Sequence, residues 1–156
     1  MDICFDYGKN LWKAVDANGK TYLYDLPVVA PGRNSQNPAD DTAEWLLTEL
    51  RDDRGNYIEY DYTIKQITTA IGPYKPVEVS LEGIWYTLFK DPKTQQIDKQ
   101  LKSYHARIVH EPSVSPTVNL TAGYPKQDTK RIRSIEVRAG NTPLVLNAGV
   151  PDGQLI

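Results

Sequence analysis

This 156-residue sequence contains one cysteine, one methionine, two histidines and two phenylalanines. The lone Cys4 excludes an intrachain disulfide, and with it a small secreted domain held together by disulfides. No apolar run approaches the roughly 18 residues that a membrane-spanning helix needs. Neither charge sign dominates, because 18 basic side chains stand against 20 acidic ones. We therefore expect no membrane span and no dedicated nucleic-acid-binding role.

The N-terminal segment, Met1 to Tyr7, is acidic and lacks the basic region and apolar core of a signal peptide. We therefore expect no cleavable signal peptide. Such a protein acts where it is made, leaves the cell by another route, or is an excised segment of a longer chain.

Tyrosine is the abundant aromatic residue, with 10 copies, and the chain also has 11 prolines and 10 glycines. Tyrosine, valine, isoleucine and threonine favour strands, whereas proline and glycine mark the turns between them. No segment has a sustained helical period. The sequence therefore predicts a single all-β domain over residues 1–156, built from antiparallel hairpins that form a twisted sheet.

Two segments have the pattern of a β-hairpin, in which two alternating strands flank a polar turn that ends in glycine. The first hairpin spans residues 11–24 and its turn ends at Gly19. The second spans residues 45–62 and its turn ends at Gly55. Turns of this kind need positive φ angles, which glycine and asparagine adopt readily.

The two hairpins also resemble each other in sequence when their glycines are aligned, which indicates an internal repeat within residues 1–62. A loop over residues 26–43 is expected to join the two units. The repeat-defining residues are Asp16, Gly19, Tyr24 and Asp25 in the first unit, and Asp52, Gly55, Tyr60 and Asp61 in the second.

Residues 63–156 are expected to form a less regular β extension. Alternation predicts strands within residues 77–86, 104–110 and 132–138. The proline-containing stretch over residues 112–125 predicts a loop.

Charge is uneven along the chain, with 6 basic and 12 acidic side chains in residues 1–62 and 12 and 8 in residues 63–156. The favoured interpretation is solvated strand faces and attraction between the two halves. A nucleic-acid surface would need aromatic residues among the cations, and only Tyr124 is near them. These cations are Lys126, Lys130, Arg131, Arg133 and Arg138.

Paired carboxylates for glycoside cleavage are one possible interpretation of Asp52 and Asp53 with Glu49 and Glu59. Turn chemistry is favoured instead, because aspartate side chains accept hydrogen bonds from their own backbone in turns. Asp52 also recurs as Asp16 in the other hairpin, which a catalytic residue has no reason to do.

Metal, cofactor and nucleophile chemistry are not indicated either. His105 and His110 lie five apart in an expected strand, so they should project from opposite faces. The start of a calcium loop at Asp16 fails, because Pro27 occupies the position that needs a glutamate. Cys4 has no base near it in the sequence. We therefore expect no cofactor, no metal and no enzymatic activity.

The three tryptophans, Trp12, Trp45 and Trp85, all lie within expected strands. Aromatic residues there most often pack against neighbouring strands. The functional alternative is a stacking platform for sugar rings, so the three remain candidate binding aromatics.

The pattern Asp-x-x-Gly-x-x-x-x-Tyr-Asp after an apolar strand resembles the YD repeat of the RHS (rearrangement hot spot) family. Residues 44–62 are similar to a segment of the plasmid-virulence B-type proteins and of the B components of insecticidal Tc toxin complexes. In that branch a unit like residues 12–24 precedes this segment and a strand like residues 131–137 follows it. The same order is present here.

The resemblance implies a large, spiralling β-sheet shell that encloses a toxic polypeptide, with the cleavage site and toxin in other parts of the protein. Two repeat units are far fewer than such a shell contains, so we expect a fragment or an element that docks onto neighbouring strands. The implied role is structural and non-catalytic, within a cytoplasmic or secreted toxin complex. Its partners would be proteins: further β-repeat segments, toxin-complex subunits or another copy.

A β-sandwich binding module for carbohydrate or a protein partner is the main alternative, and a β-rich hydrolase is a third. The shell interpretation expects Trp12 and Trp45 to be buried against the sheet, and Tyr24 and Tyr60 to occupy equivalent places. A binding module expects the two tryptophans to be exposed together along a groove.

Overall fold

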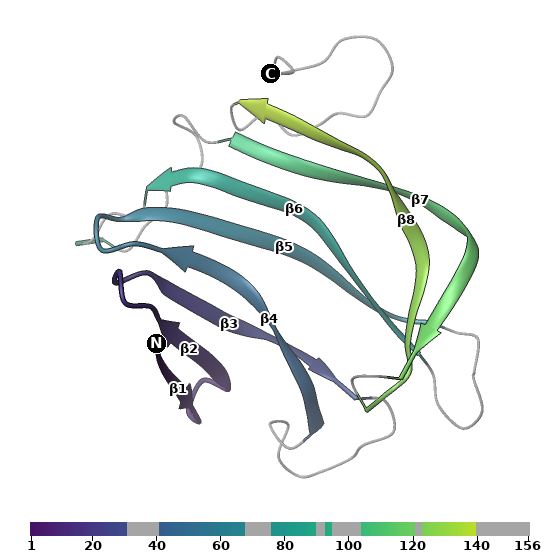
Figure 1. Cartoon of the computed structure of the whole chain (residues 1–156), viewed down its shortest axis with the longest axis horizontal. Helices are drawn as coiled ribbons and strands as arrows, with labels where there is room; N and C mark the ends of the chain where they lie inside the picture. Colours follow the sequence, from purple (N-terminus) through teal and green to yellow (C-terminus); the bar gives the residue numbers. More distant parts are fainter. Residues whose placement is uncertain (31–40, 68–75, 90–92, 95–103, 121–122, 140–156) are drawn as a thin grey trace.

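The chain forms one sheet of eight strands that follow each other in chain order (Figure 1). Each strand is antiparallel to the next, so the expected all-β fold of antiparallel hairpins is confirmed. The computed structural model describes residues 1–30, 41–67, 76–89, 93–94, 104–120 and 123–139. The strands are β1 (Asp2–Asp6), β2 (Leu11–Val15), β3 (Thr21–Val29), β4 (Thr42–Arg51), β5 (Asn56–Gln66), β6 (Val77–Phe89), β7 (Tyr104–Asn119) and β8 (Lys126–Ala139).

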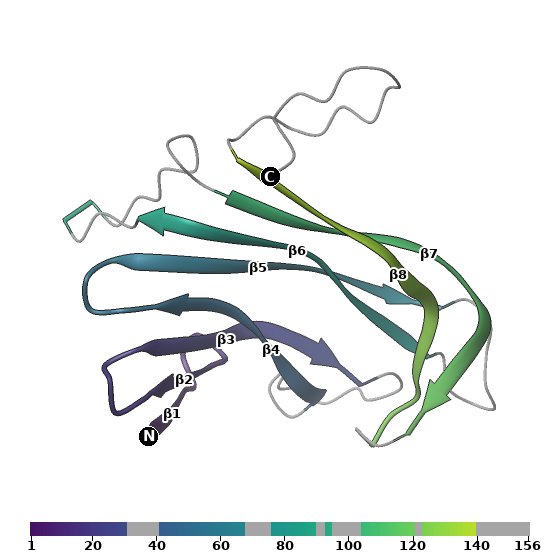
Figure 2. The same ribbon diagram turned by 45° about the horizontal axis from the view of Figure 1, so that its top comes forward.

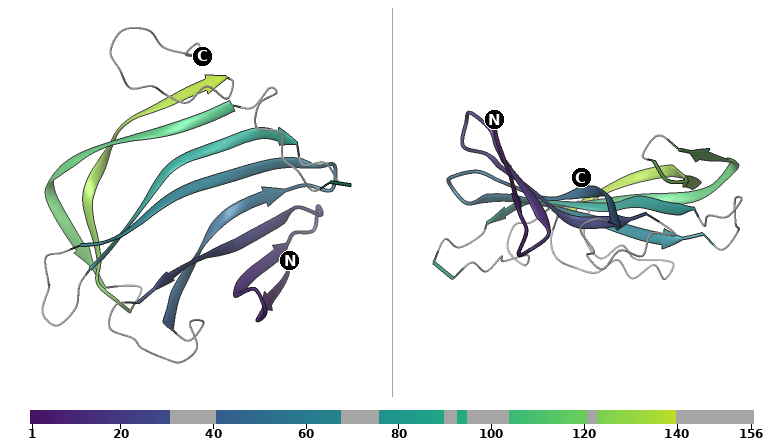
Figure 3. Two further views of the ribbon diagram at one scale, coloured as in Figure 1. Left: turned by 180° about the vertical axis from the view of Figure 1, so that it is seen from behind. Right: turned by 90° about the horizontal axis from the view of Figure 1, so that it is seen from below.

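The sheet is strongly twisted (Figure 2), and its described part is one layer thick when it is seen from below (Figure 3). Twist is the normal consequence of strand chirality. Most proteins bury the apolar face of a sheet under a second layer, and no such layer is present among the described residues. Those residues also contain no helix long and apolar enough to cross a membrane.

A small core lies where β8 crosses to the start of β6. Val77 pairs there with Lys126 in a short parallel bridge, the one departure from the antiparallel order among the described strands. The buried cluster that results contains Val28, Ala30, Val77 and Tyr124. Segments far apart in the chain therefore meet at this end of the sheet and hold it in its curved shape.

Both expected hairpins are present, as β2–β3 and β4–β5. The loop expected over residues 26–43 is too long, because β3 continues to Val29 and β4 begins at Thr42. Of this loop, residues 31–40 lie outside the described residues. The N-terminal strand β1 was not expected from the sequence at all.

The stretch over residues 112–125, expected to be a loop, is mostly strand, because β7 runs on to Asn119. Prolines are tolerated here for a geometric reason. Among the described strands, β6 pairs with β7 only along residues 104–107, so beyond that point β7 pairs with β8 and with no other described strand. A register shift between Pro112 and Thr117 accommodates the remaining irregularity.

Candidate functional site

The turn of the first hairpin is organised by Asp16. Its Oδ1 accepts hydrogen bonds from the backbone N–H groups of Asn18 at 2.8 Å and Lys20 at 3.0 Å. Gly19 adopts a φ of 77°, in the left-handed region that favours glycine.

Asp52 organises the second turn in the same way. Its Oδ1 accepts hydrogen bonds from the backbone N–H groups of Arg54 and Asn56, both at 2.9 Å, and Gly55 has a φ of 90°. The two units therefore share hydrogen-bonded turns as well as sequence. Asp52 serves the turn, as the repeat argument predicted.

The aspartates that follow the repeat tyrosines also have matching surroundings. Asp25 accepts a hydrogen bond from the hydroxyl of Thr48 on β4, and Asp61 accepts one from Trp85 Nε1 on β6 at 2.8 Å. A register shift adjoins each aspartate. Each carboxylate thus receives a side-chain donor from the next strand, at a place where the regular ladder is interrupted.

Of the remaining candidate catalytic carboxylates, Glu49 makes structural contacts, Glu59 is half-buried and Asp53 is exposed. Glu49 is buried, accepts a hydrogen bond from the Tyr57 hydroxyl at 3.2 Å and lies 3.6 Å from Arg51 Nε. Burial raises the pKa of Tyr57, and the adjacent negative charge of Glu49 raises it further. Asp53 is exposed at the turn. These surroundings suit side chains that stabilise a sheet.

We expect Asp16→Ala and Asp52→Ala each to lower the midpoint of thermal unfolding by a few degrees, because each removes the acceptor for two backbone N–H groups. Asp53→Ala is the matched control, since this neighbour is exposed and makes neither of those turn contacts. Equal losses for Asp52→Ala and Asp53→Ala would contradict the assignment of the turn to Asp52.

The same turns predict a dependence on pH. The side-chain amide of Asn56 donates a hydrogen bond to Asp52, and so do the backbone N–H groups of Asn56 and Arg54. These hydrogen bonds lower the pKa of Asp52 below its ordinary 3.8. For Asp16, partial desolvation is outweighed by backbone N–H groups and the Tyr22 hydroxyl, so its pKa is also lowered. A lowered pKa in the folded state gives stability that is complete above about pH 4 and is lost as the pH falls through the folded value. Between pH 7 and pH 2 the midpoint of thermal unfolding should fall more steeply for the wild type than for the double variant Asp16→Asn with Asp52→Asn.

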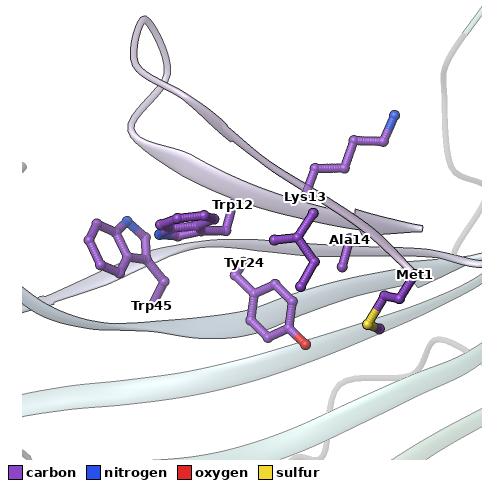
Figure 4. A pocket seen from close by; sticks show the side chains of 7 residues that line it. Met1, Trp12, Lys13, Ala14, Tyr24 and Trp45 are labelled. Atoms are coloured by element: carbon purple, nitrogen blue, oxygen red, sulfur yellow. The ribbon is translucent and has the colours of Figure 1, made fainter. Parts of the chain in front are cut away.

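Two tryptophans lie together on the N-terminal part of the sheet (Figure 4). The Trp12 and Trp45 ring centroids are 6.1 Å apart with an interplanar angle of 80°, and Phe5 contacts both rings. Trp45 is half-buried and its Nε1 donates to the carbonyl oxygen of Asn10 at 3.1 Å. Trp12 is 37% exposed, so the expectation that it is buried is wrong.

The same tryptophans line a pocket of about 260 Å³, which also includes Met1, Ile3 and Tyr24. Ligand pockets usually enclose roughly 300–1,000 Å³, so this one is small. The edge-to-face tryptophan pair does not give two coplanar stacking surfaces.

The third tryptophan, Trp85 on β6, packs against His105, its partner on β7. His105 stacks on Trp85 with ring centroids 4.1 Å apart and an interplanar angle of 7°. The ring of His105 also covers the backbone of Gly83, and a Cβ atom there would overlap its Nε2. His110 contacts Glu82 through Nδ1 at 3.5 Å, away from this stack. His105 therefore has a packing role, which the sequence alone left open.

The largest feature of the sheet is a face without charged residues. Residues directly opposite each other on antiparallel strands project from the same face, so the pairing defines its rows. We call the following set the uncharged face: Ile3, Ala14, Tyr22, Leu50 and Ile58 in one row, Phe5, Trp12, Tyr24 and Leu47 in a second, Tyr60, Ile84, Ala106 and Val137 in a third, and the pairs Tyr86–Tyr104 and Ile108–Ile135.

The uncharged face crosses all eight strands and ends at two exposed isoleucines. Ile3 on β1 is 62% exposed and Ile135 on β8 is 60% exposed. Beyond Ile108 the face is bordered by charged groups, where Glu82 lies 3.7 Å from Lys130. Tyr24 and Tyr60, the repeat tyrosines, both lie on this face, and each is paired with a residue of the following strand.

The opposite face carries charged residues on several strands. Glu136 lies 3.5 Å from Arg138, and Arg107 is directly opposite Glu136. One row that crosses the entire sheet consists of Cys4, Lys13, Leu23, Glu49, Glu59, Trp85, His105 and Arg138. The charged residues of these rows therefore lie on this face, together with Leu23 and Trp85.

No family model matches the chain, and comparison with curated proteins gives no match. Its fold is similar to that of the N-terminal domain of effector protein SpvB from Salmonella typhimurium strain LT2, with a TM-score of 0.60 and 14% sequence identity. The two share a fold. The similarity covers 94% of this chain and 53% of that domain, so the chain spans about half its length.

The fold of this neighbour agrees with the resemblance of residues 44–62 to plasmid-virulence B-type proteins. Sequence reasoning found the hairpin turns and the tyrosine positions but missed the uncharged face as a whole. A signal was present within single strands, for example in β5, where Ile58 and Tyr60 alternate with Glu59 and Asp61. Register between strands, which the sequence does not give, was needed to join these rows.

Proposed function

We propose that this chain is a non-catalytic structural segment whose sheet forms part of a larger β assembly of the RHS/YD-repeat type. The observation that carries the proposal is the uncharged face, which crosses all eight strands without a covering layer among the described residues. A sheet with one apolar face gains stability by burying it against further protein.

The carboxylates support this role. Asp16 and Asp52 hold turns, and Asp25 and Asp61 accept hydrogen bonds from adjacent strands. Their positions repeat with the hairpins, as expected for a structural unit.

The fold shared with part of the SpvB N-terminal domain is a second support. We propose on this basis that the assembly is associated with virulence or with a toxin, and that the chain serves as part of its container. The sequence resemblance of residues 44–62 to Tc toxin B components points the same way.

A binding module is the second candidate, because Trp12 is partly exposed beside Trp45 at a pocket. Under this alternative the pocket holds a small apolar or sugar ring. The edge-to-face arrangement of the two rings favours the structural role instead.

Thermal unfolding with a panel of oligosaccharides, together with hydrolase assays on glycoside and ester substrates, separates the candidates. The structural proposal expects no saturable shift of the unfolding midpoint and no turnover. Saturable stabilisation by a sugar that disappears in Trp12→Ala would support the binding module instead. Turnover that is abolished by Asp52→Asn would support the hydrolase.

A further inference from the structure

The two end strands of the sheet, β1 and β8, differ in charge. The strand order places them at opposite ends, and no described strand pairs with the outer side of β1 or of residues 134–139 of β8 (Figure 1). β1 carries two aspartates and no basic side chain. β8 carries five basic side chains and two acidic ones. One end of the sheet is therefore acidic and the other is basic.

Neither end is suited to pairing with its own copy. An unpaired edge can accept a further strand, whose backbone gives affinity and whose side chains give specificity. Two copies of β1 in antiparallel register centred on Cys4 would place Asp2 opposite Asp6. Two copies of β8 would set five basic side chains beside another five. Like charges directly opposite each other destabilise a strand pair, so each end favours the other end.

The topology lets the two ends join as a continuation of the same sheet. Each of the eight strands is antiparallel to the next, so β1 and β8 run in opposite directions. A second copy in the same orientation would therefore present its β8 antiparallel to β1. The uncharged face would also continue across the junction, since Ile3 lies on it at one end and Ile135 at the other.

One register of this junction matches both polarity and charge. β1 has five residues, and residues 134–139 pair with β7 without a register shift, so a regular ladder of five pairs fits. A shift by two residues in one direction would set Phe5 opposite Arg133. A shift by two in the other would set Asp6 opposite Glu136, and a shift by one would reverse the faces. The facing pairs in the matching register are Asp2 with Arg138, Ile3 with Val137, Cys4 with Glu136, Phe5 with Ile135, and Asp6 with Ser134.

We propose that copies of this chain join head to tail, with β1 of one copy paired to β8 of the next in this register. The proposal rests on the structural role inferred above and names the partner for the two ends of the sheet. The contact uses two different surfaces, so it can repeat along a series of copies. Its ladder is short, so we expect a transient interface of the kind that buries less than about 1,200 Å².

Disulfide trapping detects such a transient contact and tests its register. Glu136→Cys places a thiol directly opposite the exposed Cys4 of the next copy. Opposite residues on antiparallel strands have Cα atoms about 4.5–5.5 Å apart, within the roughly 4.4–6.8 Å that a disulfide needs. Ser134→Cys is the matched control, because Ser134 is exposed and on the same face of β8 but faces Asp6 in this register. Circular dichroism checks that both variants fold.

Glutathione disulfide is the oxidant, at about 100 µM protein, which is well below the ~1 mM effective concentration of two aligned thiols. We therefore expect Glu136→Cys to cross-link roughly 10-fold faster than Ser134→Cys. Electrophoresis without reductant should show a ladder of dimers, trimers and larger species. Mass spectrometry should find Cys4 of one copy joined to position 136 of another.

A second pair of positions makes the test independent of Glu136, whose carboxylate lies 3.5 Å from Arg138. In a Cys4→Ser background, Ile3→Cys with Val137→Cys should cross-link between copies, because these positions also face each other. Ile3→Cys with Ile135→Cys is its control, two residues out of register.

The inference would be overturned if neither in-register pair cross-linked faster than its control, or if the disulfide formed within one chain. Either result leaves the structural role in place with another partner at the ends of the sheet. Failure of the structural role has a separate signature, which is sugar binding through Trp12 or turnover that depends on Asp52.

Discussion

Replacing Tyr124 by alanine is expected to lower the free energy of unfolding by about 3–5 kcal/mol, as large aromatic-to-alanine changes in cores do. Tyr124 is 3% exposed and belongs to the small cluster that contains Val28 and Val77. Total stabilities of single domains are about 5–15 kcal/mol, so this loss would unfold a large part of the population.

The polar end of Tyr124 adds to its effect. Its hydroxyl donates to Glu44 Oε1 at 3.0 Å, and Lys126 Nζ donates to the same oxygen at 2.8 Å. Burial, with the negative charge of Glu44 beside it, raises the pKa of Tyr124. Tyr124→Phe keeps the ring and removes one donor, so we expect it to cost about 1 kcal/mol.

Urea unfolding followed by circular dichroism measures these changes. Tyr7→Ala is the control, because Tyr7 is 87% exposed and its removal should change stability by less than about 0.5 kcal/mol. If Tyr124→Ala were no more destabilising than Tyr7→Ala, the cluster at the β8 crossing would not be the core of this sheet.

Gly83→Ala is expected to destabilise the chain by about 1–3 kcal/mol, the usual cost of adding a methyl group where there is no room. The new Cβ would overlap the ring of His105, which stacks on Trp85 and therefore cannot move without losing that contact. Trp85 in turn donates to Asp61, so displacement of the histidine would disturb one of the repeat aspartates.

A double-mutant cycle tests this explanation. In a His105→Ala background the overlapping ring is absent, so Gly83→Ala should cost little or even add stability by restricting the unfolded chain. An undiminished cost of Gly83→Ala in that background would assign the effect to backbone conformation and not to the histidine.

The local structure of this chain was readable from the sequence because it depends on short-range chemistry. Asp16 and Gly19 belong to one turn, and alternation in residues 57–62 marks a strand whose two sides differ in polarity. Both signals arise among residues a few positions apart. The all-β fold and the two hairpins followed directly.

Where the strands end was less predictable, because the ends depend on neighbours. Pro112 and Pro116 suggested a loop, yet β7 continues through this stretch because one of its edges pairs with no strand in the described part of the chain. β1 carries little signal of its own and is a strand because β2 pairs with it. Such outcomes are decided by contacts between segments.

The sequence by itself determined the all-β fold, the two hairpin turns and the alternation of apolar with charged residues, because each of these follows from the chemistry of adjacent residues. Only the tertiary structure decided which rows of side chains lie side by side. Register places Tyr22 beside Leu50 and Tyr60 beside Ile84, and so joins separate apolar stripes into one uncharged face. A shift of one residue in any strand would have sent its stripe to the polar side.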